Sequence, residues 1–338
     1  MTLTTQYILK GDREAMVKIK DFTLNQLVNT TLVITRATAR KTKAGKPYLQ
    51  LEMFDGCRTI SGNYWDWTSG KIPEVNAIVD IEAQVTDYMG NLQLNVKRLS
   101  LNADKHLSDF APQSNVNIGD IYREAYELAT NIKDDFIRTL TITLLENFMQ
   151  KWCSAPGAVK VHHAFVGGTL VHSVSVAKIA LAVSKQIPES NNDLCVAGGL
   201  LHDIGKLYTY EMNGVTVDMT PMGKLYDHTF IGAELIGSVV HTLSIEVDED
   251  KLMILRHIVL AHHGALEYGA AVPPQCIEAH IVHHADGIDA VTQQILESSI
   301  GLDERMFTER IYTLGNKNQL TPQYISNTMV NKEELPLE

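Results

Sequence analysis

Apolar and polar positions along this chain follow two different periods. Between Val28 and about Leu101, β-branched and aliphatic residues alternate with polar ones, which is the period of half-buried β-strands. The turn signals AGKP and MGN, each containing a glycine, separate these strand-like stretches. From about residue 118 to 300 the apolar positions recur every three or four residues, as in amphipathic helices. The pattern predicts a multidomain chain, with an N-terminal all-β part followed by an all-α part.

Shifts in composition place the boundaries between these parts. Short strands joined by glycine-containing turns favour a small barrel, and an OB-fold fits this length, although another small barrel or a sandwich fits the pattern as well. The polar stretch DKHLSDFAPQSNVNI has the composition of a linker, and only NGVTVDMT at 213–220 is strand-like within the helical part. The expected organisation is an N-terminal extension at 1–14, the barrel at 15–103, the linker at 104–118, the helical domain at 119–300 and a polar tail at 301–338.

The cysteines and the N-terminus indicate a cytoplasmic protein. Its four cysteines lie far apart with no CxxC pair, which argues against a zinc ribbon or a disulfide framework. The first residues contain no apolar core of signal-peptide length, and no segment approaches eighteen consecutive apolar residues. We therefore expect neither secretion nor a membrane-spanning segment.

The charge of the chain is unevenly distributed. The net charge is −11, but residues 1–103 contain 13 Lys and Arg against 10 Asp and Glu, so the barrel part is mildly basic and the remainder carries −14. Basic and aromatic residues mix there, as in proteins that bind single-stranded nucleic acid by phosphate contacts and base stacking. An equally strong interpretation is that the aromatic residues fill the barrel and the lysines form a solvated hairpin. The candidate nucleic-acid contacts are Arg36, Arg40, Lys43, Lys46, Tyr48 and Trp65.

Histidines are concentrated in the helical part, where twelve of the thirteen lie between His162 and His284. Five stretches each place metal-ligand side chains on or beside an expected helix. Each stretch alone is more typical of a hydrogen-bonded core histidine or of a helix end that complements the dipole. Five such stretches in one chain together favour a metal site. The candidate ligands are His172, His202, Asp203, His228, His262, His263 and Asp286.

The types of these residues indicate which metals the site would take. Imidazole and carboxylate without thiolate suit Mn²⁺, Fe, Co²⁺ or Mg²⁺ better than structural zinc. We expect Gly205 to end the helix after LLHD, so that Asp203 faces ions beyond the helix end, where a carboxylate can bridge two of them. The hypothesis is that one ion is held by His172, His202, Asp203 and Asp286, and the other by Asp203, His228 and either His262 or His263.

These motifs resemble a known family. His172, then His202-Asp203, then Asp286 resemble the H…HD…D signature of the HD-domain metal-dependent phosphohydrolases. The preceding barrel, together with HHAFVGGTLVHSVSVA, GGLLHDIGKL, LAHHGALEYGAAVPPQCIEAHIVHHADGIDA and FTERIYTLGN, is similar to the YhaM-type 3′-to-5′ exoribonucleases over roughly residues 15 to 315. The resemblance implies hydrolysis of single-stranded RNA, with single-stranded DNA as a second substrate, from the 3′ end.

The expected mechanism uses an activated water. Two divalent cations, with Mn²⁺ as the first choice, would activate the water and clamp the phosphodiester oxygens near Asp203. Lys206 would neutralise developing charge on the phosphate, although a surface lysine that complements the helix dipole is an equal alternative. His163 is a candidate for contacting substrate or for donating a proton to the leaving oxygen, and Asp289 is a candidate for orienting a ligand histidine.

Two rival functions fit the same motifs. One is an HD phosphohydrolase of nucleotides or cyclic nucleotides in which the barrel is regulatory. The other is a non-enzymatic protein that binds single-stranded nucleic acid. Apolar helix faces are compatible with a homo-oligomer, but the sequence alone does not separate such faces from the core.

Overall fold

The computed structural model describes residues 18–56, 58–68, 70–110, 116–159, 165–300, 302 and 306–323. The chain divides into two compact units between His106 and Leu107. The candidate site residue His163 and the ends 1–17 and 324–338 lie outside the described residues. Within the described ranges, no helix is both long and apolar enough to cross a membrane.

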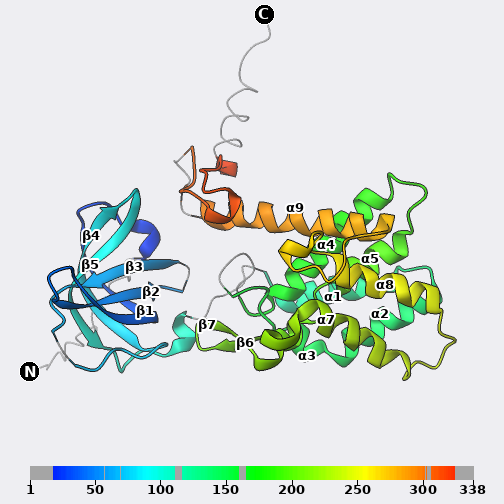
Figure 1. Cartoon of the computed structure of the whole chain (residues 1–338), viewed down its shortest axis with the longest axis horizontal. Helices are drawn as coiled ribbons and strands as arrows, with labels where there is room; N and C mark the ends of the chain where they lie inside the picture. Colours follow the sequence, from blue (N-terminus) through cyan, green and yellow to red (C-terminus); the bar gives the residue numbers. More distant parts are fainter. Residues whose placement is uncertain are drawn as a thin grey trace, which may run out of the picture. The chain divides into compact units, whose positions relative to one another are not determined.

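The N-terminal unit is a closed five-stranded barrel, shown in blue and cyan in Figure 1. Its strands follow one another around the barrel in the order β1-β2-β3-β5-β4, with a parallel pair between β3 and β5 and antiparallel pairs elsewhere. This is the arrangement of an OB-fold, so the predicted fold of this part is confirmed. The elements are η1 (Ile19–Asp21), β1 (Leu27–Lys41), β2 (Pro47–Phe54), β3 (Thr59–Tyr64), β4 (Ile78–Tyr88) and β5 (Asn91–Leu101).

Strand β1 closes the barrel because it pairs with two different neighbours. Its first half pairs with β4 and its second half with β2, and the register shifts between Ile34 and Arg36. Such an irregularity bends a strand. Alternate residues of the strands face inward, including the fully buried Leu32, Ile34 and Leu94. Gly62 lets β3 approach β5, since a Cβ there would lie 2.7 Å from Met53 Cε and 3.2 Å from the Leu94 carbonyl oxygen.

The C-terminal unit is helical, as predicted. It also contains the hairpin of β6 (Tyr210–Asn213) and β7 (Thr216–Met219), which overlaps the strand-like stretch expected at 213–220. The helices are α1 (Ile118–Thr130), α2 (Asp135–Asn147), α3 (Met149–Trp152), α4 (Gly168–Ser184), α5 (Asn192–Leu201), α6 (Lys206–Thr209), α7 (Pro221–Val240), α8 (Glu249–Ala261) and α9 (Ile277–Ser299), with the 3-10 turns η2 (Leu107–Phe110), η3 (Leu266–Tyr268) and η4 (Tyr312–Leu314).

Helix α5 lies at the centre of this unit. Every residue from Leu194 to Leu201 is buried, and α5 packs against α2, α4, α8 and α9 (Figure 1). Gly199 permits the approach of α4, since a Cβ there would lie 2.5 Å from the Ala177 Cα. The end of α5 is thereby held among the helices that carry the other histidines.

The region after α9 contains more local structure than its weak periodicity indicates. Phe307 forms an antiparallel bridge with Leu320, and Ile311 forms one with Lys317. Gln294 of α9 accepts a hydrogen bond from the Thr313 hydroxyl. Isolated bridges require no run of alternating residues, so hydrophobic periodicity carries no signal for them.

Candidate metal centre

The candidate ligands lie in three long helices and directly after the ends of two others. His172 lies in the second turn of α4, and His202 and Asp203 directly follow α5. His228 lies in α7, His262 and His263 follow α8, and Asp286 lies in α9. Although as many as 114 positions separate them in the printed sequence, their polar atoms converge on one buried region.

A first group of ligand atoms surrounds the Nε2 atom of His172. His202 Nε2 lies 3.1 Å from it, Asp286 Oδ1 3.2 Å and Asp203 Oδ2 3.4 Å. Ligand atoms of His172, His202 and Asp203 all lie within 4.8 Å of one another, and all three residues are buried. This spacing allows one cation to contact all of them after small adjustments.

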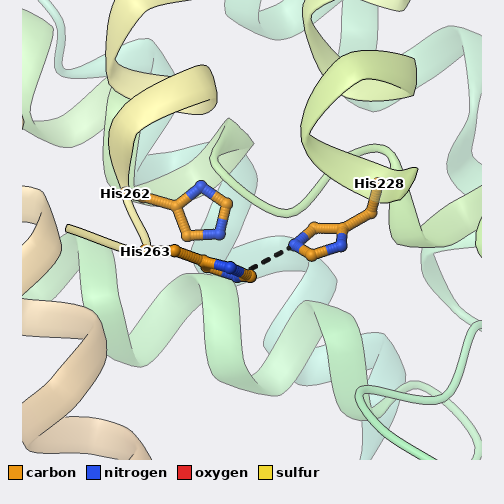
Figure 2. A group of neighbouring side chains, drawn as sticks. All are labelled: His228, His262 and His263. Atoms are coloured by element: carbon orange, nitrogen blue, oxygen red, sulfur yellow. Dashed lines mark hydrogen bonds between the residues drawn. The ribbon is translucent and has the colours of Figure 1, made fainter. Parts of the chain in front are cut away.

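A second group consists of His228, His262 and His263, whose ligand atoms also lie within 4.8 Å of one another. Figure 2 shows the three imidazole rings turned toward one another from two different helices. The Nε2 atoms of His228 and His263 are 3.2 Å apart. The sequence left open which of His262 and His263 belongs here, and the structure brings both of them to the group.

Asp203 lies between the two groups and directs one oxygen to each. Its Oδ2 is 3.4 Å from Nε2 of both His172 and His202. Its Oδ1 is 3.5 Å from His228 Nε2 and 3.6 Å from His262 Nε2. Within the described part of the chain, this buried Oδ1 has no hydrogen-bond partner. Burying a carboxylate oxygen without a partner is costly, so the donor set fits a divalent cation.

The outer nitrogen of every histidine in the two groups is held by an acceptor. Nδ1 of His202 lies 2.9 Å from the Gly199 carbonyl oxygen. A carbonyl only accepts, so Nδ1 must carry a hydrogen and Nε2 is the ring nitrogen that faces the centre. The remaining acceptors are Asp289 Oδ2 for His172 at 2.6 Å, Asp227 Oδ1 for His228 at 2.5 Å, the Val259 carbonyl for His262 at 2.7 Å and the Tyr268 carbonyl for His263 at 2.9 Å.

The electrostatic environment keeps the carboxylates ionised. Burial would raise the pKa of Asp203, but the charges of Lys206 and His202 hold it well below its usual range. Burial likewise opposes ionisation of Asp286, but the hydrogen bond and charge of His172 lower its pKa strongly. Ionised carboxylates beside imidazole lone pairs are the ligands that a divalent cation needs.

The net pKa shifts of the buried histidines differ in direction. Burial lowers the pKa of His262 well below its usual range and also lowers that of His263, which favours the neutral ligand form. Burial also acts to lower the pKa of His172, but hydrogen bonds with Asp286 and Asp289 outweigh it and raise the pKa to about 9. A cation that binds at His172 Nε2 must therefore displace a proton.

Gly205 does not end a helix, contrary to expectation. Helix α5 ends at Leu201, and Gly205 has right-handed helical angles, φ −63° and ψ −24°, before α6. A Cβ at Gly205 would lie 1.9 Å from the carbonyl oxygen of His228. The glycine is therefore explained by the close approach of α7, which brings His228 to Asp203, and a contact of this kind leaves no local pattern in the sequence.

Asp227 interrupts α7 directly before His228. Its φ of +62° and ψ of 157° are not helical, and a positive φ is unfavourable for a residue with a Cβ. The Asp227 carboxylate accepts from both the backbone N–H and the Nδ1–H of His228. The interruption and these two hydrogen bonds fix the direction of the His228 ring.

Lys206 is held inside the site and not on the surface. Its Nζ lies 2.6 Å from Asp203 Oδ2, and its side chain is 14% exposed. Tyr210, which the sequence did not single out, also belongs to this region. Burial raises the pKa of its phenol, and the charges of Lys206 and Asp203 act on it. A tyrosine that begins a short hairpin carries no recognisable sequence signal.

On the barrel, two of the predicted contact residues line a hollow. The hollow has a volume of about 240 Å³, and Arg36 and Arg40 are among its lining residues. Its other lining residues are Thr38, Gln50, Leu51, Glu52 and Ser61. These lining residues lie together because β1, β2 and β3 are paired strands. Arg36 of β1 is opposite Glu52 of β2, and Thr38 is opposite Gln50.

The aromatic candidates of the barrel lie outside its core. The rings of Tyr48 and Trp65 are 4.4 Å apart between centroids and inclined by 31°, and Trp65 is exposed. Tyr64 and Trp67 pack against the core instead. The interpretation that Tyr48 and Trp65 fill the barrel is therefore wrong. Of the two lysines, Lys43 is exposed in the turn after β1, and Lys46 lies 3.5 Å from Asp66.

The helical fold brings imidazole and carboxylate groups together in one candidate metal centre. Residues 169–291 match the family model of the HD domain, so this stretch of the chain is an HD domain. The barrel is similar to the second OB-fold domain of replication protein A from Methanococcus maripaludis, solved in solution by NMR. The two are 17% identical over 27% of this chain and 96% of that one, with a TM-score of 0.23.

Proposed function

We propose that this protein is a metal-dependent 3′-to-5′ exonuclease that hydrolyses the phosphodiester bonds of single-stranded RNA and of single-stranded DNA. The observation that carries the hydrolytic part is the placement of Asp203, whose two oxygens face two separate histidine groups. The polarity rests on the resemblance to YhaM-type exoribonucleases. The ligand set favours Mn²⁺, with Fe, Co²⁺ and Mg²⁺ as chemically related alternatives.

The residues would divide between two cations. His172, His202, Asp203 and Asp286 would hold one cation, and Asp203 would share the other with His228, His262 and His263. When bound, such cations supply a Lewis acid for phosphoryl oxygens and lower the pKa of a water molecule. Because their Nδ1 atoms are already bonded, the histidines present Nε2 without reorganising.

Lys206 and His163 are the proposed groups for handling the phosphate and the leaving oxygen. An ammonium has three N–H donors; the pair with Asp203 takes one, and a phosphate oxygen would take another. This contact would stabilise the charge that develops on the phosphate. His163 is proposed, from its position before α4 in the sequence, to protonate the leaving oxygen.

The barrel is proposed to hold the strand. Arg36 and Arg40 would contact phosphates, and the exposed Trp65 with the half-buried Tyr48 would stack on bases. A binding surface for a polymer favours an exonuclease over a phosphohydrolase of free nucleotides. Lys43 and Lys46 would add a salt-dependent attraction to the backbone.

A time course with 5′-labelled single-stranded RNA and DNA in Mn²⁺ tests the function. The expected result is a ladder that shortens from the 3′ end. Asp203→Asn should abolish it, whereas Asp250→Asn, which changes an exposed carboxylate at the start of α8, should not. Hydrolysis of deoxynucleoside triphosphates or cyclic dinucleotides with intact RNA would favour the nucleotide phosphohydrolase instead. RNA binding without hydrolysis of any of these substrates would favour a binding protein.

A further inference from the structure

His283 of α9 adjoins the second group without belonging to it. Its half-buried imidazole lies against the turn after α8, and its Nδ1 is 2.6 Å from the backbone carbonyl oxygen of His262. A carbonyl only accepts a hydrogen bond, so Nδ1 carries a hydrogen and donates it to this oxygen. His283 therefore holds the backbone of a candidate ligand, whose own ring faces the centre.

The carbonyl that His283 holds lies at a helix end. Helix α8 ends at Ala261, and carbonyls at the end of a helix have no partner inside it. The carbonyls of Ala261 and His263 accept from backbone N–H groups of the turn at 2.8 and 3.0 Å. The His262 carbonyl between them accepts from His283. A side chain of α9 thus completes the hydrogen bonding of the turn that carries both ligand histidines.

Gly264, directly after the two histidines, leaves room for the His283 ring. Its φ of +79° lies in the left-handed region, which favours glycine. A Cβ at this position would also lie 2.5 Å from Nε2 and 2.9 Å from Nδ1 of His283. The backbone angle and the close packing both require glycine here, so the turn and the imidazole of α9 fit together as one unit.

The rings of His262 and His263 are oriented by their own segment of chain. Nδ1 of His262 lies 2.7 Å from the Val259 carbonyl oxygen, and Nδ1 of His263 lies 2.9 Å from that of Tyr268. These acceptors are three and five positions away in the sequence, so they orient each ring relative to nearby backbone. They do not hold that backbone against another helix, and the contact from His283 does.

Helix α9 contributes to both groups from one face. Asp286 is three residues after His283, and residues with this spacing are neighbours on a helix surface. Asp286 Oδ1 lies 3.2 Å from Nε2 of His172 in the first group. Ligand atoms of Asp286, His202 and His262 also lie within 4.8 Å of one another. The helix that supplies a ligand to the first group therefore also holds the turn that supplies two ligands to the second.

We propose that His283 is a positioning residue for the cation of the second group. Through the His262 carbonyl, it fixes the imidazoles of His262 and His263 at the distance from Asp203 and Asp286 at which two cations bind together. This inference rests on the two-cation centre of the proposed function. It does not depend on which phosphodiester is hydrolysed.

Titration calorimetry of Mn²⁺ into the metal-free, full-length protein tests this role. His283→Leu removes the donor and keeps a branched side chain beside Gly264. It should lower the affinity for one of the two ions by about 10- to 100-fold, as for loss of other residues that support metal ligands. That ion should be the one weakened by Asp227→Asn and not the one weakened by Asp289→Asn. Wild-type affinity for both ions in His283→Leu would overturn the proposal.

Matched variants separate the hydrogen bond from general damage to the fold. His283→Asn places an amide N–H near the position of Nδ1 and should restore most of the lost affinity. His283→Gln places its amide near the position of Nε2 and should not restore it. His284→Leu makes the same substitution as His283→Leu at the exposed neighbouring histidine and should bind both ions as wild type does. Equal weakening of both ions in His283→Leu and His283→Gln, or no recovery in His283→Asn, would overturn the proposal.

Assays of RNA hydrolysis keep this result separate from the proposed function. If wild type binds two Mn²⁺ ions and His283→Leu loses one, but wild type hydrolyses no nucleic acid, the exonuclease function fails and the positioning role stands. If wild type degrades RNA and His283→Leu binds both ions normally, the function stands and the positioning role fails. Binding of a single ion by wild type would also overturn the positioning role.

Discussion

Asp289 lies 2.6 Å from Nδ1 of His172, and its carboxylate is buried in α9 behind the first histidine group. Asp227 has the same relationship to His228 of the second group, at 2.5 Å. The other three histidines give Nδ1 to backbone carbonyls. Each group therefore contains one histidine supported by a carboxylate, which raises the basicity of that imidazole and holds its orientation.

Replacing these two carboxylates should weaken the two ion sites separately. Asp289→Asn should reduce the affinity of the first site, and Asp227→Asn that of the second, each by about 10- to 100-fold, because an amide lacks the charge that supports the imidazole. Titration calorimetry of Mn²⁺ into the metal-free protein would measure both sites. Loss of the same ion in both variants would contradict the division into two groups.

Replacing Lys206 should reduce turnover and leave metal binding nearly intact. Lys206→Met keeps the length of the side chain but removes the charge beside Asp203 Oδ2. If the ammonium contacts the phosphate, kcat should fall by about 10²- to 10³-fold, as for loss of one charge-stabilising donor. Mn²⁺ stoichiometry by elemental analysis is the control measurement. An unchanged kcat would restrict Lys206 to a structural ion pair.

Gly205→Ala should destabilise the helical unit. The added Cβ would lie 1.9 Å from the His228 carbonyl oxygen, so α6 and α7 would have to separate. Overpacking of this kind costs about 1–3 kcal/mol or more in the free energy of unfolding, measured by urea denaturation. Gly287→Ala is a matched control in α9, because a Cβ there meets nothing within 4 Å. That variant should gain about 0.5–1 kcal/mol from helix propensity.

Contacts of the barrel with phosphates and with bases should differ in salt dependence. Arg36→Ala and Arg40→Ala should each weaken RNA binding and reduce the slope of log K against log salt by about 1. Trp65→Ala should weaken binding by about 1–3 kcal/mol with little change in that slope, because stacking releases no counterions. Fluorescence anisotropy at several salt concentrations would measure both. Arg98→Ala, at an exposed arginine of β5 near Glu82, should change neither quantity.

An ion-pair cluster between α2 and α8 should contribute to acid sensitivity. Lys251 Nζ lies 2.6 Å from a carboxylate oxygen of both Asp134 and Asp248, which cap the two helices. For Asp134, burial raises the pKa, but the Ile137 N–H and Lys251 outweigh it and lower the pKa. For Asp248, the hydrogen bond from Lys251 is the largest cause of a lowered pKa.

The sign of the pH effect follows from these lowered pKa values. In the unfolded chain these aspartates have a pKa of about 3.9. The stabilisation by the cluster is therefore present above that pH, and it is lost as the pH falls through the lower pKa values of the folded state. Urea unfolding of wild type between about pH 6 and pH 2 should therefore show this loss. Lys251→Met should flatten the dependence below about pH 4. An unchanged slope in the variant would show that the cluster does not couple to folding.

The sequence by itself determined which segments form strands or helices, and it identified most of the candidate metal ligands. Alternation in 28–101 and the helical period in 118–300 depend on which side of each segment is buried, and that is a local property. The stretches around His172, His202-Asp203, His228 and Asp286 were recognisable because their residue types share one chemistry. Hydrophobic periodicity and ligand chemistry are both written into short segments.

Only the tertiary structure decided how those segments meet. It placed both His262 and His263 in one group, divided the two oxygens of Asp203 between two groups, and explained Gly205 by contact with α7 instead of by a helix end. It also set Tyr48 and Trp65 outside the core of the barrel. These relationships depend on packing between residues distant in the chain, and no local pattern encodes the distance between two helices.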